Sequence, residues 1–185
     1  MAETPSTMIP LGTQAPSFRL VDVCQNQYVT LEELRSDIAT VIMFICNHCP
    51  YVKHIQTKLV EVANHYQKKG IHFIAINSND TKAYPADNPA NMILEAKKFN
   101  YPFPYLFDET QEVAKAYRAA CTPDFYIFDT QLKCVYRGRF DDATPGNNKP
   151  VTGADLSQAL DQILNHQPVS SDQKNSLGCN IKWQK

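Results

Sequence analysis

The chain has 185 residues, of which 43% are hydrophobic and 20% are charged, with 6 glycines and 12 prolines. This composition is typical of one globular domain of average size and excludes collagen-like, low-complexity and disordered chains. Lys and Arg number 18 against 19 Asp and Glu, so the formal net charge is −1. The chain has no basic excess to bind a phosphate backbone, and we expect no nucleic-acid partner.

An N-terminal β-hairpin is the first element that the sequence predicts. Residues 15–22 alternate apolar and polar side chains as a strand does, and residues 28–31 follow a polar turn. Thr30 is placed to cap a short helix over residues 31–35, with Glu33 three positions later as in a capping box. The hairpin is therefore expected to lead directly into this helix.

A β-α-β unit follows the hairpin. Residues 40–46 form an uninterrupted apolar run, which indicates a strand buried on both faces. Residues 51–69 carry apolar side chains at helical spacing, and Gly70 ends that helix. A second apolar run occupies residues 71–77. Two such strands joined by a helix pair in parallel, so we expect a sheet that is parallel at its centre.

The second half of the chain alternates helices and strands after a loop at residues 78–89. The expected elements are a helix near 89–99, a strand at 103–108, a helix at 110–119, an antiparallel hairpin of strands at 125–129 and 133–140, and a helix at 152–166. A proline interrupts the strand at 103–108, which favours a peripheral position in the sheet or late entry into it. The architecture predicted is one α/β domain with a mixed central sheet flanked by helices.

The domain is expected to span residues 1–166 and to be followed by a C-terminal tail at residues 167–185. The tail is polar until it reaches an apolar segment that contains Ile181 and the only tryptophan, Trp183. These two side chains are expected to anchor the segment on the domain. Cys179 lies beside them, and a lone thiol in such a place is usually incidental.

Whether the cysteines are thiols or disulfides depends on the cellular compartment of the protein. The six are Cys24, Cys46, Cys49, Cys121, Cys134 and Cys179. Residues 1–12 lack the basic and apolar regions of a signal peptide, and no run approaches the ~20 apolar residues of a membrane span. We therefore expect a cytoplasmic protein without membrane contact, whose cysteines are thiols by default.

Cys46 and Cys49 form a C-x-x-C motif where a buried strand passes into a helix. The free N–H groups and the dipole of a helix N-terminus stabilise a thiolate, which is the reactive form of cysteine. Pro50 fits the first helical turn and puts Cys49 at the N-cap or next to it. We expect Cys49 to be the nucleophile and Cys46 to be its resolving thiol or a packing residue; the alternative is that both are inert buried cysteines.

Three other cysteines carry weaker signals. Cys121 precedes Thr122-Pro123 at the start of a strand, where a cis X-Pro bond is one way to make the required turn. Cys24 lies on a turn and Cys134 lies in a strand, and neither has a chemical companion in the sequence. We expect these last two to be structural or incidental.

Several segments together resemble the thioredoxin-like superfamily. They are residues 44–52 with Cys49-Pro50, residues 122–129 with Thr122-Pro123, and residues 178–183. Within the superfamily they are most similar to the alkyl hydroperoxide reductase/thiol-specific antioxidant group of peroxiredoxin-like proteins, in a cytosolic subfamily. The resemblance extends over about residues 10–183. It implies a thioredoxin-like fold, with a mixed central sheet flanked by helices and an N-terminal hairpin, and makes residues 1–166 a thioredoxin-like (redoxin) domain.

The resemblance also implies roles for individual residues. Cys49-Pro50 matches the Cys-Pro of the peroxide-reactive cysteine. Thr122-Pro123 matches the cis-proline of the superfamily, which faces the reactive cysteine and aligns the substrate backbone. This match implies that Cys121 lies near Cys49 as a possible resolving thiol.

The motifs differ from those of both thioredoxins and peroxiredoxins. Relative to thioredoxins, Val52 stands where the resolving cysteine is expected. Relative to peroxiredoxins, Cys46 stands where a threonine is expected and Ile42 where a proline is expected. The resemblance therefore leaves both a disulfide and a peroxide open as the substrate.

The leading hypothesis is a thiol-dependent oxidoreductase in which the Cys49 thiolate attacks a disulfide or a peroxide. Cys46 would resolve the mixed disulfide or sulfenic acid, with Cys121 or Cys179 as the other possible resolving thiols. The expected partner is a thiol reductant of the thioredoxin or glutathione type, or a disulfide client. This chemistry requires no cofactor and no metal.

Two other classes of function stay open at this point. Cys46, His48 and Cys49 are soft ligands suited to copper or zinc, and a zinc site would take a fourth ligand from Cys121 or Cys179. A non-catalytic thioredoxin-fold binding module would tolerate replacement of Cys49 by serine. Metal analysis distinguishes the first class, and the effect of that replacement distinguishes the second.

Overall fold

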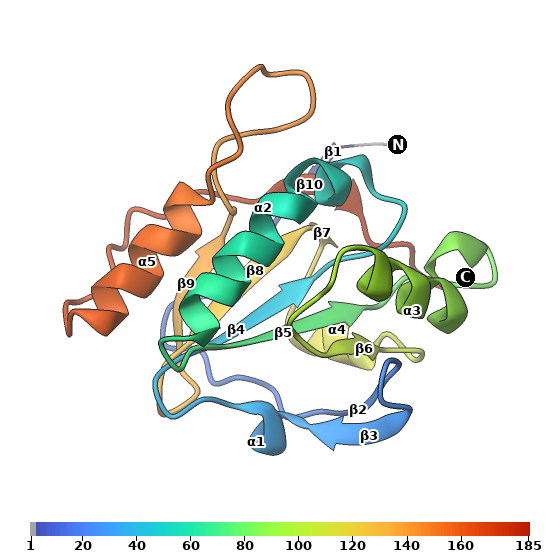
Figure 1. The fold of residues 1–185 in the computed structure, drawn as a ribbon, viewed down its shortest axis with the longest axis horizontal. Coiled ribbons are helices and arrows are strands. Elements are labelled where there is room, and N and C mark those ends of the chain that lie inside the picture. Colours follow the sequence, from blue (N-terminus) through green and yellow to red (C-terminus); the bar gives the residue numbers. More distant parts are fainter. Residues whose placement is uncertain (1–2) are drawn as a thin grey trace.

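The computed structural model describes residues 3–185. A seven-stranded mixed sheet forms its centre (Figure 1). Its strands, in spatial order, are β3 (Gln27–Thr30), β2 (Arg19–Asp22), β6 (Tyr105–Phe107), β5 (His72–Asn77), β4 (Thr40–Phe44), β8 (Asp124–Phe128) and β9 (Cys134–Gly138). The pairs β4–β5 and β5–β6 are parallel and the others are antiparallel. The predicted mixed sheet, parallel at its centre and with an N-terminal hairpin, is confirmed.

The central strand β4 explains why its sequence is uninterruptedly apolar. All five of its residues are buried. Val41 and Met43 point into the hydrophobic core on one face of the sheet, while Ile42 and Phe44 point into the core on the other face. Because side chains alternate along a strand, a strand covered on both faces needs apolar residues at every position.

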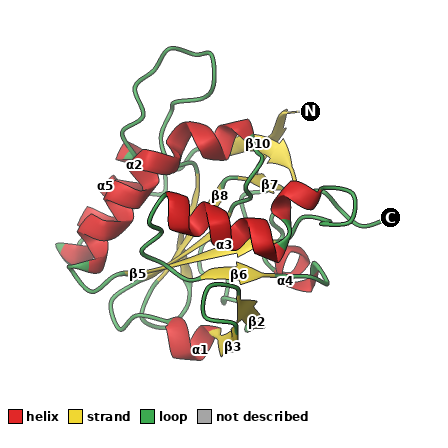
Figure 2. Ribbon diagram, turned by 45° about the vertical axis from the view of Figure 1, so that its right-hand side comes forward, coloured by secondary structure: helices red, strands yellow, loops and turns green. Residues whose placement is uncertain are grey.

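Helices cover both faces of the sheet. They are α1 (Leu31–Leu34), α2 (Pro50–Gln67), α3 (Pro89–Lys98), α4 (Glu112–Ala116) and α5 (Ala154–Leu164), with a short 3₁₀ helix at Pro85–Asp87. Buried residues of α2, α3 and α5 share one core, and those of α1 and α4 belong to the other. Figure 2 shows α2, α3 and α5 together on one side. The capping box of Thr30 and Glu33 at α1 is present as predicted.

Strand β6 agrees in part with its prediction. Of the two alternatives that the proline suggested, a peripheral position is wrong, because β6 lies inside the sheet between β5 and β2, and late entry is confirmed, because the strand begins at Tyr105. Pro104 immediately precedes the strand, and its carbonyl oxygen accepts a hydrogen bond from the Ala75 N–H at 3.1 Å. The missing N–H of proline therefore falls outside the ladder of β6 and costs no strand pairing.

A second, three-stranded sheet was not predicted. It has the order β1 (Glu3–Pro5), β10 (Leu177–Asn180), β7 (Cys121–Thr122), with antiparallel pairing throughout. It lies beside the N-terminal end of α2 (Figure 1). The polypeptide after α5 thus returns to this end of the molecule and adds a strand there.

The two residues expected to anchor the tail differ in burial. Ile181 is buried in the same core as α4, as predicted. Trp183 is 40% exposed, with Lys115 Nζ 5.9 Å from the centroid of its ring, so it is covered only in part. Hydrogen bonds of the Lys182 backbone also hold this part of the chain. Among the described residues, no helix has the length and apolar character needed to cross a bilayer.

Candidate active site

Cys49 lies at the N-terminal end of α2. It is the N-cap residue, with φ −68° and ψ 123°, and Pro50 occupies the first helical turn. Proline is favoured there because an N–H at that position has no partner within the helix. The backbone N–H of Val52, in the first turn of α2, helps to lower the pKa of the Cys49 thiol. The predicted N-cap position is confirmed, and the helix terminus acts directly on this thiol.

Two other thiols lie around the Cys49 sulfur. The side chains of Cys46, Cys179 and Thr122 all influence the pKa of Cys49, and Cys179 pairs with Thr122 between β10 and β7. Cys46 Sγ also lies 3.4 Å from Thr122 Oγ1. In its thiol form, Cys49 Sγ donates to the Thr122 carbonyl oxygen at 3.2 Å. The structure therefore brings together four of the residues that the sequence predicted for the site.

The three thiols titrate very differently. Hydrogen bonds to the Cys49 sulfur, that from Cys46 above all, lower the pKa of Cys49 to about 5 although burial opposes the shift. The same hydrogen bond, together with burial and the charge of Asp87, raises the pKa of Cys46 well above its usual value. Burial first, and then the hydrogen bond to Cys49, raise the pKa of Cys179 to about 12. At neutral pH the group holds one negative charge, on Cys49, in the nucleophilic form.

Cys121 is buried close to the site, but its thiol is directed elsewhere. Cys121 Sγ donates to the Pro123 carbonyl oxygen at 3.6 Å, and burial raises the pKa of this thiol. The peptide bond between Thr122 and Pro123 is cis, as predicted. Of the three thiols considered for resolving Cys49, those of Cys46 and Cys179 therefore influence its pKa, whereas that of Cys121 hydrogen-bonds to Pro123.

The remaining cysteines show no link to this site. Cys24 is exposed, and Cys134 is buried in β9. Cys134 Sγ donates to the Tyr136 carbonyl oxygen at 3.3 Å, and burial raises the pKa of Cys134 to about 12. Both residues offer natural controls for experiments on the reactive thiols.

Asp87 fixes the loop that carries the C-x-x-C motif. One carboxylate oxygen accepts the backbone N–H groups of Asn47 (2.8 Å) and His48 (3.3 Å), and the other lies 2.5 Å from His48 Nδ1 and 2.8 Å from Asn79 Nδ2. Burial alone would raise the pKa of Asp87, but these hydrogen bonds, led by that of His48, hold it below its usual value. The sequence did not single out Asp87, because one aspartate 40 positions from Asn47 carries no local signal.

Replacing Asp87 with alanine should destabilise the fold by about 3 kcal/mol, because several buried donors would lose their acceptor. Chemical denaturation of the reduced protein measures this change. Asp172→Ala is the matched control, since Asp172 forms an exposed ion pair with Lys174, and its denaturation midpoint should equal that of the wild type. Equal midpoints for both variants would contradict the role of Asp87 in holding the loop.

A possible metal site overlaps the same loop. Donor atoms of Cys46, His48 and Asp87 lie within 4.8 Å of one another, in a search of the described residues. This group contains two of the predicted ligands, but Asp87 takes the place of Cys49, and neither Cys121 nor Cys179 joins it. Both Asp87 oxygens are already occupied by hydrogen bonds. A metal ion would have to displace them, so the arrangement favours thiol chemistry.

Comparison with known proteins identifies the family. A family model described as AhpC/TSA family matches residues 11–137. The chain belongs to the AhpC/TSA family. This family membership confirms the resemblance drawn from the sequence.

Individual relatives of this AhpC/TSA chain differ widely in similarity. The crystal structure of an uncharacterized conserved protein from Geobacillus kaustophilus is 60% identical, with a TM-score of 0.98 over 100% of this chain and 97% of that one. The thiol-disulfide oxidoreductase ResA of Geobacillus thermodenitrificans is 24% identical over 86% of this chain and 82% of its own length. The thioredoxin domain of a thiol-disulfide oxidoreductase from Bacteroides vulgatus has 14% identity and a TM-score of 0.61, over 72% of this chain and 91% of that one. This last similarity shows that the fold is thioredoxin-like.

Proposed function

We propose that the protein is a thiol-dependent oxidoreductase in which Cys49 is the attacking thiolate and Cys46 is the resolving thiol. The observation that carries this proposal is the position of Cys49 at a helix N-terminus, with its pKa lowered to about 5 by hydrogen bonds from neighbouring groups. Membership of the AhpC/TSA family and the similarity to ResA support an oxidoreductase. The name of ResA further favours a disulfide as the substrate.

The reaction with a disulfide proceeds by two exchanges. The Cys49 thiolate attacks one substrate sulfur, a mixed disulfide forms, and the other substrate sulfur leaves as a thiolate. Cys46 then loses its proton and attacks the Cys49 sulfur, which forms the Cys46–Cys49 disulfide and releases the second substrate thiol. Both thiols already lie against Thr122 before the reaction, with Cys46 Sγ 3.4 Å from its Oγ1 and Cys49 Sγ 3.2 Å from its carbonyl oxygen.

The reaction with a peroxide differs only in its first step. The Cys49 thiolate attacks one peroxide oxygen, the O–O bond breaks, and an alcohol or water leaves as Cys49 becomes a sulfenic acid. Cys46 attacks that sulfur and water leaves. In both cases two electrons pass from the thiol pair to the substrate, and a cellular thiol reductant of the thioredoxin or glutathione type returns them.

We also propose a cytoplasmic location, where such reductants keep thiols reduced.

Disulfide mapping after one equivalent of hydrogen peroxide tests the roles of the thiols. Wild type should yield a Cys46–Cys49 disulfide, because both thiols lie against Thr122 and the motif is local. In Cys46→Ser, Cys49 should form a disulfide with Cys179 or stay as a sulfenic acid. In Cys179→Ser, the Cys46–Cys49 pair should form as in wild type. Oxidation of Cys24 or Cys134 ahead of Cys49 would contradict the proposal.

A further inference from the structure

The proposed nucleophile is completely covered. Cys49 has an exposed fraction of 0%. Part of its cover is β10, which pairs antiparallel with β7 so that Cys179 lies opposite Thr122. Figure 1 shows β10 beside the N-terminal end of α2, where Cys49 lies. A polypeptide substrate therefore has no access to the Cys49 sulfur while β10 stays in this place.

Gly178 allows β10 to lie directly against β7. A Cβ atom at this position would lie 2.0 Å from the carbonyl oxygen of Thr122 and 3.2 Å from the backbone nitrogen of Pro123. The first distance is far below van der Waals contact, so any other residue at this position forces the strand away. The Gly178-Cys179 sequence thus fits the edge of β7 and places Cys179 opposite Thr122, whose carbonyl oxygen lies 3.2 Å from Cys49 Sγ.

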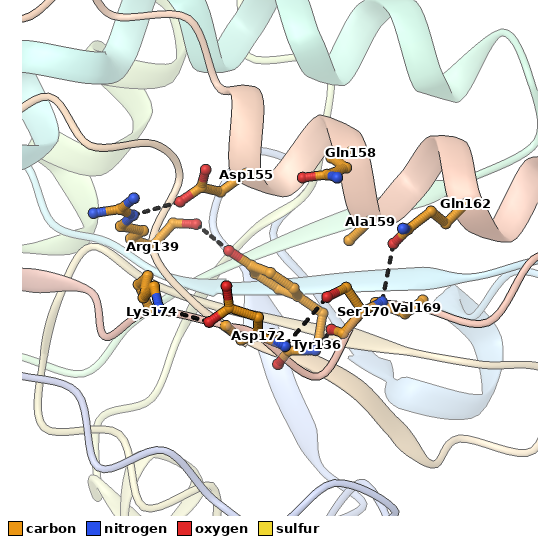
Figure 3. A pocket seen from close by; sticks show the side chains of 11 residues that line it. Tyr136, Arg139, Asp155, Gln158, Ala159, Gln162, Val169, Ser170, Asp172 and Lys174 are labelled. Carbon is orange, nitrogen blue, oxygen red and sulfur yellow. Dashed lines mark hydrogen bonds and ion pairs between the residues drawn. The ribbon is translucent and has the colours of Figure 1, made fainter.

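The chain leading into β10 lies on the surface up to residue 172, and from Gln173 to Ser176 it is hydrogen-bonded to β9, to Ser6 and to Pro123. No residue from 165 to 175 is buried. At the hollow of about 190 Å³ beside β9 and α5, the Ser170 N–H donates to Gln162 Oε1 at 3.1 Å, and Lys174 forms an ion pair with Asp172 (Figure 3). Such surface contacts open at low cost, because they bury little apolar area and compete with water.

The chain leaving β10 is attached to the loop after β5 and to α4. The Lys182 N–H donates to Asn79 Oδ1 at 2.9 Å, and Gln111 Nε2 donates to the Lys182 carbonyl oxygen at 2.8 Å. Ile181 is buried between these contacts and β10. β10 leaves β7 only when the hydrogen bonds of Gln173 and Ser176 and the pairing of β10 with β1 give way, while the end of the chain stays attached.

Displacement of β10 would expose a docking edge. The backbone groups of Cys121 and Thr122 in β7 would lose their strand partner, and an unpaired strand edge is a template for an extended chain. A cavity of about 140 Å³ lies beside this edge, with Tyr51, Pro123 and Phe140 in its lining. It offers space for one side chain of the segment that pairs there.

We propose that β10 is an intramolecular pseudo-substrate. It occupies the β7 edge as an extended client polypeptide would, with Cys179 in the place of the client's sulfur, and a polypeptide disulfide reaches Cys49 only by displacing it. The partner is an extended segment with a small residue directly before its cysteine, in the order of Gly178-Cys179. The reaction of that client rests on the proposed function, whereas the docking edge rests on the strand geometry.

Peptide binding without chemistry tests the docking edge. The probe is a fluorescent hexapeptide, Ser-Leu-Gly-Ser-Asn-Ile, which has the sequence from position 176 to 181 with serine for cysteine. Cys49→Ser is compared with Cys49→Ser/Gly178→Val by fluorescence anisotropy. Because the valine side chain forces β10 off β7, the double variant should bind the probe at least ~10-fold more tightly. Affinities within about twofold of each other would overturn the proposal.

Two further variants serve as controls for the peptide-binding test. Leu177→Val alters an exposed side chain of the same strand, so in the Cys49→Ser background it should bind the probe as weakly as Cys49→Ser alone. If the Gly178→Val variant does not fold, Ile181→Ala loosens the attachment of β10 through a buried side chain instead. Its amide hydrogen exchange over residues 177–180 should then be at least ~10-fold faster than that of wild type, and unchanged exchange would also overturn the proposal.

Failure of the two proposals is distinguishable. Reaction of 2-hydroxyethyl disulfide with Gly178→Val, which retains Cys49, reports on the thiol chemistry alone. If this variant binds the peptide and its Cys49 does not react, the docking edge stands and the oxidoreductase proposal fails. If Cys49 reacts and the peptide does not bind, the oxidoreductase proposal stands and the docking edge fails.

Discussion

Replacement of Cys49 by serine should reduce turnover of small disulfides and of hydrogen peroxide by at least ~10³-fold. The serine hydroxyl does not ionise at neutral pH, so the group that forms the covalent intermediate is lost. The neighbouring thiols do not replace it, because burial and the charge of Asp87 still raise the pKa of Cys46, and burial still raises that of Cys179. A coupled assay with a thiol reductant measures the loss.

Cys24→Ser is the matched control for this substitution. Cys24 is the exposed cysteine of the chain, so the same chemical change there should leave turnover within about twofold of wild type. If Cys49→Ser retained a tenth of the activity, another thiol would be the nucleophile. A non-catalytic binding module would show no difference between the two variants, because neither would turn over.

The position of the nucleophile was predictable because its signal is local. A buried strand, two cysteines, a proline and an apolar helical stripe follow one another within 30 residues, and each part constrains its neighbours in space. The β-α-β centre was predictable for the same reason. The sequence left two alternatives for β6, a peripheral position or late entry into the sheet, because it does not show on which side of Pro104 the strand pairing begins.

The three-stranded sheet that covers Cys49 could not be predicted from sequence patterns. It joins three strands of two to four residues from widely separated parts of the chain, and strands this short have no periodicity. The need for glycine at Gly178 exists only because Thr122 lies against it. Asp87 was missed for a related reason, since its four hydrogen bonds reach a loop 40 positions away and its own neighbours.

The stability of the reduced protein should also depend on Cys49 through pH. The pKa of Cys49 is about 5 in the folded chain against an ordinary value of 9.0. Between these values the unfolded chain binds a proton that the folded chain has lost, so this thiol makes folding more favourable as pH rises. The contribution is complete above pH 9 and is lost as pH falls toward 5, with a slope of about 1.4 kcal/mol per pH unit.

A buried carboxyl group opposes this slope over much of the same range. Burial raises the pKa of Asp124 to about 8 from an ordinary value of 3.8, although Tyr126 donates a hydrogen bond to it at 3.0 Å. The folded chain therefore keeps a proton that the unfolded chain releases, and this group makes folding less favourable as pH rises from about 4 to 8. The two slopes have opposite signs, so the wild type should show a weak net dependence between pH 5 and 8.

Comparison of variants separates the two contributions. From pH 6 to pH 8 the free energy of unfolding of wild type should rise by about 3 kcal/mol relative to Cys49→Ser. Groups that do not interact with Cys49 cancel in the difference, and the Cys46 and Cys179 thiols stay protonated over this range because their pKa values are raised. Asp124→Asn should show the opposite trend and gain stability relative to wild type as pH rises. Urea denaturation under reducing conditions, with Cys134→Ser as a buried control, measures each difference. A pH-independent difference for Cys49→Ser would mean that the folded chain holds Cys49 as a thiol at neutral pH, and the proposed nucleophile would then lack its activation.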